Sequence, residues 1–178
     1  LRTAAASAVA VDCLTSRSPK VVALLGSGVL ARTHATALRA VRPVSEVRVW
    51  SRNPDNVANC AKHVKGVACA SAEEATREAD IVCTVTTARE PVLKGAWLRR
   101  GALVAAVGAP RPAWRELDDD AMANVVISDS YEAAAQESGD VILSGARVFA
   151  ELGEILAGTR LPPASGSTFR WCSRRRNG

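Results

Sequence analysis

The chain has 178 residues, 48% of them hydrophobic, so it can bury a sizeable core, and both intrinsic disorder and a small disulfide-stapled fold are excluded. The net charge is +5, but Arg170, Arg174, Arg175 and Arg176 near the end account for most of that excess, and only 4% of the residues are aromatic. A nucleic-acid partner is therefore not expected, and neither is a membrane, because no apolar run reaches the roughly 18 residues of a span.

The first half of the chain alternates between predicted helices and strands. Residues 3–14 are rich in alanine and predict a lead-in helix. The fully apolar run at residues 21–25 is typical of a strand that is covered on both faces in a parallel sheet. Further strands are expected at residues 47–50, 67–70 and 80–85, and further helices at residues 29–41, 56–64 and 72–78.

The second half continues this alternation with weaker patterns. Strands are expected at residues 102–107 and 125–127, and a final helix at residues 145–157, which Gly158 closes. Strands that alternate with helices at this spacing predict a parallel sheet with helices on both faces. We therefore expect a doubly wound α/β domain of the Rossmann type over residues 1–160, with a mostly parallel sheet of about six strands.

The last residues are predicted to lie outside this domain. Residues 161–167 have the composition of a linker, because proline, glycine and serine dominate there. Residues 168–178 have no periodicity, and we expect them to be disordered. The prediction is a linker with a basic tail over residues 161–178.

A glycine-rich turn follows the first predicted strand. Gly26, Gly28 and Ala31 match the Gly-x-Gly-x-x-Gly/Ala pattern, whose glycines allow a tight turn and a close approach of a pyrophosphate to the backbone. The helix that follows would direct its free N–H groups at the anion. The alternative is a tight turn that binds nothing. A strand before the turn and a helix after it favour a dinucleotide.

The end of the second predicted strand distinguishes the two nicotinamide cofactors. Domains specific for NAD place an acid there for the ribose 2′-hydroxyl, whereas an arginine accommodates the 2′-phosphate of NADP. This chain has Ser51, Arg52 and Asn53, and Asp55 is the first acid after the strand. The alternative is an ordinary solvated arginine. The sequence therefore favours NADPH, with NADH less favoured.

Other strand ends should border the same ligand, because in open α/β sheets ligands bind at the carboxyl ends of the strands. Thr86 and Thr87 follow one strand, and residues 108–112 follow the next. Residues 128–130 and 136–140 are rich in hydroxyl and acidic groups near the same edge. Each group has a simpler alternative: the threonines cap a strand, and a serine caps a helix.

No recognisable metal site or nucleophilic constellation is present. Residues 118–120 are three aspartates, which we interpret as the first turn of a helix. His34 and His63 have no partner at a catalytic spacing, so packing or surface roles are expected. The five cysteines include no Cys-x-x-Cys pair, which indicates reduced thiols and a cytoplasmic location. No catalytic residue is assigned.

Several longer runs are similar to one known family. The longest of these runs are more specific than the glycine turn, and the runs are spread along nearly all of residues 1–160. They are residues 2–8, 26–29, 47–52, 107–109, 111–112, 114–119, 137–141, 143–146 and 149–154. On these runs the chain resembles the ornithine cyclodeaminase/mu-crystallin family, and more closely its mu-crystallin branch.

The resemblance implies an NADPH-dependent ketimine reductase, which passes a hydride to the C=N carbon of a cyclic imino acid. It also implies a homodimer for the full-length members. A second candidate function follows from the same resemblance: NADPH-dependent binding of thyroid hormone by a crystallin that has no turnover.

The resemblance also assigns site residues. Arg2 and Thr3 would meet the cofactor or the substrate carboxylate, for which a guanidinium offers two parallel donors. Glu137 would face the substrate or the hormone. The implied cofactor-binding set is Arg2, Thr3, Gly26, Ser27, Gly28, Val29, Leu30, Ser51, Arg52, Asn53, Thr86, Ala88 and Val107.

The chain departs from the family in three places. Pro110 stands where the cyclodeaminases carry a catalytic aspartate and the mu-crystallin branch a serine, so deamination of ornithine is not expected. Family members carry a long segment before the position of Arg2, which builds a second domain for substrate binding and dimerisation, and it is largely absent from this sequence. The tail after Phe169 is expected to be unrelated to the family. A third hypothesis is thus an incomplete product without either activity.

Overall fold

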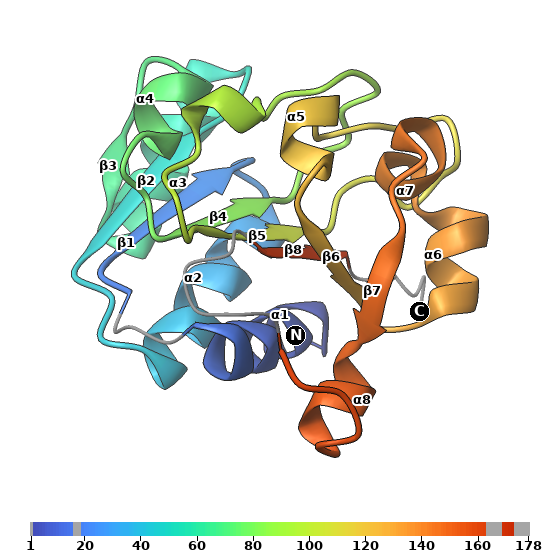
Figure 1. Cartoon of the computed structure of the whole chain (residues 1–178). Helices are drawn as coiled ribbons and strands as arrows, with labels where there is room; N and C mark the ends of the chain where they lie inside the picture. The colour runs from blue at the N-terminus through green and yellow to red at the C-terminus, as the bar shows by residue number, and fades with distance from the viewer. Residues whose placement is uncertain (1, 16–18, 163–168, 173–178) are drawn as a thin grey trace.

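The computed structural model describes residues 2–15, 19–162 and 169–172, and these residues form one sheet of eight strands (Figure 1). The strand order is β3-β2-β1-β4-β5-β8-β6-β7, and every pairing is parallel. This confirms the doubly wound α/β prediction. The strands are β1 (Val21–Leu25), β2 (Glu46–Trp50), β3 (Val67–Ala68), β4 (Ile81–Thr84), β5 (Leu103–Ala106), β6 (Val125–Ser128), β7 (Val148–Glu151) and β8 (Phe169–Cys172).

The central strands are largely apolar and buried, since helices cover both of their faces. All residues of β4 and β5 are buried, and so are four of the five residues of β1. β2 alternates instead between buried and half-buried positions. Leu25 at the end of β1 pairs with Trp50 of β2 and Thr84 of β4, so three strands end at the same level. This edge positions the candidate site.

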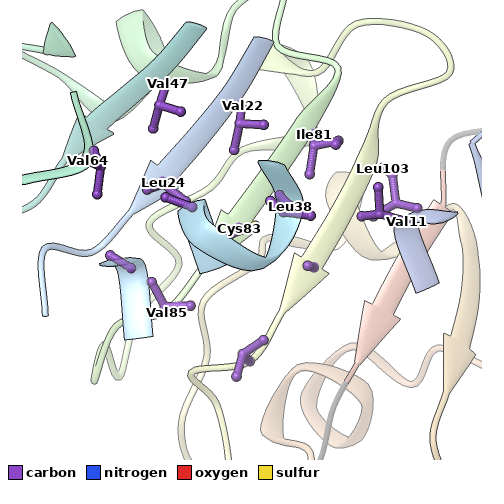
Figure 2. Packing of buried hydrophobic residues seen from close by; sticks show 14 of the residues in the cluster. Val11, Val22, Leu24, Leu38, Val47, Val64, Ile81, Cys83, Val85 and Leu103 are labelled. Atoms are coloured by element: carbon purple, nitrogen blue, oxygen red, sulfur yellow. The ribbon is translucent and has the colours of Figure 1, made fainter. Parts of the chain in front are cut away.

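Two sets of helices cover the two faces of the sheet (Figure 1). Val22 and Leu24 face the first set, which is α1 (Arg2–Leu14), α2 (Val29–Val41), α3 (Pro54–Val64) and α8 (Leu152–Leu156). Figure 2 shows the packing on this face. Ala23 and Leu25 face the second set, which is α4 (Ala72–Thr76), α5 (Asp119–Met122), α6 (Tyr131–Glu137) and α7 (Gly139–Ser144). A short 3-10 helix, η1 (Gly95–Trp97), lies between β4 and β5 in the sequence. No helix in the described ranges is long and apolar enough to cross a membrane.

The lead-in helix α1 packs against α2 through a buried polar contact. The Nε2 atom of His34 lies 3.1 Å from the hydroxyl of Ser7, and its Nδ1 atom lies 2.7 Å from the carbonyl oxygen of Leu30. Burial lowers the pKa of His34, so the neutral ring is favoured. The predicted packing role of His34 is confirmed.

The predicted final helix over residues 145–157 is confirmed for Leu152–Leu156, with Gly158 in a left-handed conformation beyond its end, and is wrong for residues 145–151. α7 ends at Ser144, and Gly145 adopts a left-handed conformation with φ of 68°. The β-branched and aromatic residues that follow form β7 instead, because they pair with β6. A new helix, α8, starts at Leu152, and the side chains of Glu151 and Glu154 cap its first turn reciprocally.

The predicted disorder after residue 168 is wrong for residues Phe169–Cys172, which form β8. This strand pairs with β5 on one side and with β6 on the other. Its order depends on two partners that are distant in sequence, so no local periodicity could show it. The other residues of the predicted linker and tail from 163 onward lie outside the described residues.

Candidate functional site

The glycine turn joins β1 to α2 in a geometry that only glycine accepts. Gly26 has a φ of +125°, and a Cβ atom there would lie 2.7 Å from the carbonyl oxygen of Val85. Its amide donates to the carbonyl of Trp50 over 2.7 Å, which ties the turn to the end of β2. A side chain at Gly28 would meet nothing within 4 Å, so the turn opens toward free space.

The start of α2 is suited to an anion. Gly28 is the N-cap residue and has no side chain to bond the first amides of this 13-residue helix. Those N–H groups therefore point outward at the positive end of the helix dipole. Phosphate oxygens are a suitable partner for them.

A cavity of about 470 Å³ lies in front of this turn. It contains nine of the predicted cofactor residues: Gly26, Ser27, Gly28, Val29, Leu30, Ser51, Arg52, Asn53 and Thr86. Thr87, which the sequence places in the same loop as Thr86, also lines it, and so do four residues to which sequence reasoning assigned no contact: Trp50, Asn56, Val85 and Val92. No acidic residue is among the described residues that line it. Among the unassigned residues, Asn56 could have been predicted from the sequence, because it lies in the first turn of α3, shortly after the Ser51–Asn53 segment.

Hydroxyl and amide groups hold the end of β2 against the glycine turn. The hydroxyls of Ser27 and Ser51 lie 2.8 Å apart. The Asn53 side chain accepts a hydrogen bond of 3.1 Å from the amide of Asn56 and caps α3. Arg52 between them is exposed, and it forms no salt bridge within residues 2–15, 19–162 and 169–172. Its guanidinium is thus available to a phosphate at the rim of the cavity.

A buried carboxyl group lies behind the other side of the cavity. Oε1 of Glu116 accepts hydrogen bonds from the amide and the hydroxyl of Thr86, each 2.6 Å long, and Oε2 accepts one of 2.7 Å from the amide of Gly108. Burial raises the pKa of Glu116 to about 7; the bonds from Thr86 oppose that rise, and the nearby charge of Asp140 adds to it. Sequence reasoning missed this residue, because an acid between Arg115 and Leu117 reads as a surface group.

Five predicted site residues are not among those that line the cavity. Ala88 and Val107 are buried in the loops after β4 and β5. Arg2 is exposed and Thr3 half-buried at the start of α1, and Glu137 is half-buried at the end of α6. The structure therefore brings together the residues that were predicted to meet the pyrophosphate and the 2′-phosphate, and leaves the predicted substrate residues Arg2 and Glu137 apart from them.

Two of the simpler interpretations are confirmed. Asp118 caps α5 by accepting from the amide of Ala121 over 2.8 Å, and it also accepts from the amide of Gly95. Ser130 caps α6 by accepting from the amide of Ala133. Among the described residues, no group of three or more His, Cys, Asp or Glu side chains is placed to hold a metal ion.

Comparisons with known proteins place this geometry in context. The model of the ornithine cyclodeaminase/mu-crystallin family matches residues 1–162. Ketimine reductase mu-crystallin from Macropus fuliginosus is 49% identical over 162 residues, which are 89% of this chain and 52% of that protein. Delta(1)-pyrroline-2-carboxylate reductase from Bacillus cereus is 33% identical over 175 residues, which are 90% of this chain and 54% of that protein. The chain thus spans about half the length of these curated relatives.

A solved structure extends the similarity to three dimensions. Delta(1)-pyrroline-2-carboxylate reductase from Thermococcus litoralis, in complex with NADH and L-proline, superposes with a TM-score of 0.89 at 34% identity. The match covers 98% of this chain and 58% of that one. It therefore extends beyond residue 162, where the family match ends.

Proposed function

This chain belongs to the ornithine cyclodeaminase/mu-crystallin family, and from that premise we propose that it is the dinucleotide-binding part of an NADPH-dependent reductase of cyclic imino acids. One observation carries the proposal: the cavity in front of the glycine turn places an exposed arginine, and no described acid, where the adenosine ribose of a dinucleotide would lie. A cytoplasmic location and homodimer formation are part of the same proposal.

The residues present fit a dinucleotide phosphate. Gly26 and Gly28 leave room for the pyrophosphate, and the uncapped start of α2 supplies N–H donors for it. Arg52 provides a bidentate, permanently charged partner for a 2′-phosphate. NADH would leave this arginine without its anion, which is the reason for proposing NADPH.

The substrate class follows from the relatives, two of which are named for cyclic imino acids or ketimines. When bound, NADPH would supply a hydride to the imine carbon while the imine nitrogen gains a proton, which gives a cyclic amino acid and NADP⁺. The loops after β4 and β5 would orient the nicotinamide, since Thr86 and Gly108 lie at that edge of the sheet.

Two measurements test the proposal. Titration of the purified chain with NADPH and with NADH, followed by nucleotide fluorescence, should give saturable binding with tighter binding of NADPH. Addition of Δ1-pyrroline-2-carboxylate to the chain with NADPH should then lower the absorbance at 340 nm. Failure to bind NADPH saturably would refute the proposal.

A binding protein without turnover is the second candidate, and Pro110 favours it. This residue directly follows the buried Ala109 in the loop after β5, and it has neither an amide proton nor a polar side chain to offer a substrate. NADPH-dependent binding of thyroid hormone with no oxidation of NADPH on addition of the imine would select this candidate. Turnover of the imine would reject it.

A further inference from the structure

We propose that Glu116 is a positioning residue for the nicotinamide half of the cofactor site, an inference that rests on the proposed function. Its carboxyl group is the link between the loops that follow β4 and β5. One oxygen binds Thr86, which lines the cavity, and the other binds the amide of Gly108. The two loops are thus held at a fixed separation by a single side chain.

The contact requires both a carboxylate and a glycine. All three partners of Glu116 are donors, and a carboxylate presents acceptors in every direction. An amide in its place would turn an NH₂ group toward at least one of these donors. At Gly108, a Cβ atom would lie 2.2 Å from Oε1 of Glu116 and 2.4 Å from the carbonyl oxygen of Thr86. The two loops can therefore approach this closely only with glycine at residue 108.

A second carboxylate holds the backbone of Glu116 from the other direction. Oδ1 of Asp140 in α7 accepts from the amides of Glu116 and Leu117 over 2.8 and 3.0 Å. Gly139 lies against the same loop, because a Cβ atom there would be 1.8 Å from the carbonyl oxygen of Trp114. The position of Glu116 is thus fixed by α7, which follows the helix that ends at Glu137.

The adenosine half of the cavity is built without Glu116. The amide of Gly26 donates to the carbonyl of Trp50, the hydroxyls of Ser27 and Ser51 lie 2.8 Å apart, and Asn53 accepts from the amide of Asn56, so none of these contacts involves Glu116. Loss of Glu116 should therefore weaken contacts to the nicotinamide half alone. A general loss of stability would affect both halves.

The test compares two nucleotides on the same variants. NADPH occupies both halves of the site, whereas adenosine 2′,5′-bisphosphate occupies only the adenosine half and carries the same 2′-phosphate. Dissociation constants are measured at pH 8 for the wild-type chain, Glu116→Gln and Glu116→Asp, with folding checked by near-UV circular dichroism. Asp80→Asn is the matched control, because Asp80 accepts from the amides of Lys20 and Val21 over 2.8 and 2.9 Å at the opposite edge of the sheet.

We expect Glu116→Gln to weaken NADPH binding about tenfold, the size of one lost charge-assisted hydrogen bond, with binding of the bisphosphate unchanged. Glu116→Asp, one methylene shorter, should likewise weaken binding of NADPH and leave binding of the bisphosphate unchanged. It provides the test if Glu116→Gln does not fold. Asp80→Asn should lower the melting temperature and change neither affinity.

Other outcomes overturn the proposal in distinguishable ways. Three outcomes would show that Glu116 supports the fold and does not position the nicotinamide half of the site. They are equally weakened binding of both nucleotides, unchanged binding of both, and failure of both Glu116 variants to fold. Absence of NADPH binding by the wild-type chain would instead refute the proposed function.

Discussion

Replacement of Arg52 by glutamine should remove the preference for NADPH over NADH. The side chain is exposed at the rim of the cavity and forms no salt bridge in the described part of the chain, so the variant should disturb little of the fold. A hydrogen bond between charged groups contributes roughly 1.5–3 kcal/mol, and exposure places this one at the low end because water screens it. The expected result is therefore about tenfold weaker binding of NADPH.

The assay is fluorescence titration of both nucleotides at several salt concentrations. NADH affinity should not change in Arg52→Gln, and added salt should weaken NADPH binding more in the wild-type chain than in the variant. Arg100→Gln is the control, because Arg100 is also exposed but precedes β5 at the opposite edge of the sheet. Equal losses for NADPH and NADH, or an unchanged ratio, would contradict the role given to Arg52.

Three further predictions concern the fold and its charges. Gly26→Ala should lower the free energy of unfolding by about 1–3 kcal/mol in urea melts, because Gly26 has a positive φ and an added Cβ atom would clash with Val85; it should also abolish NADPH binding. Gly153→Ala is the control: an added Cβ atom there would meet no other atom within 4 Å, so the change should be neutral or slightly stabilising. Between pH 4.5 and 7 the folded chain keeps a proton on Glu116 that the unfolded chain releases, so the wild-type free energy of unfolding should fall by about 3 kcal/mol over this window relative to Glu116→Gln. A difference that does not vary with pH would mean that folding does not raise the pKa of Glu116. Asp140→Asn keeps an oxygen for both amides but removes the charge that raises the pKa of Glu116, so this pH-dependent fall should end at a lower pH and be smaller.

The parts of the site that sequence predicted well are those built from consecutive residues. The turn from Gly26 to Leu30 and the segment from Ser51 to Asn53 each follow a strand directly, and the rule that ligands bind at the carboxyl ends of strands was enough to bring them together. The strong apolar runs of β1 and the helix over residues 29–41 were equally local signals.

The parts that sequence missed depend on residues distant along the chain. The contacts of Glu116 come from Thr86 and Gly108, which lie elsewhere in the sequence, and nothing in its own neighbours indicates burial. The short run of β7 gives no clear period, so the sequence predicts helix there, and pairing with β6 decides the strand conformation instead. In both cases tertiary contacts override the local pattern.

The position of β8 has a consequence for the order in which the sheet can assemble. β5 and β6 do not pair with each other, and each contacts β8 instead. The five neighbouring strands β3, β2, β1, β4 and β5 can pair as soon as residue 106 has been synthesised, whereas β6 and β7 are joined to them in the sheet by β8, which follows the other described strands in sequence. The half of the domain that carries the glycine turn can therefore pair its strands early in translation, and the half that carries Glu137 pairs with it only when β8 joins the two exposed strand edges.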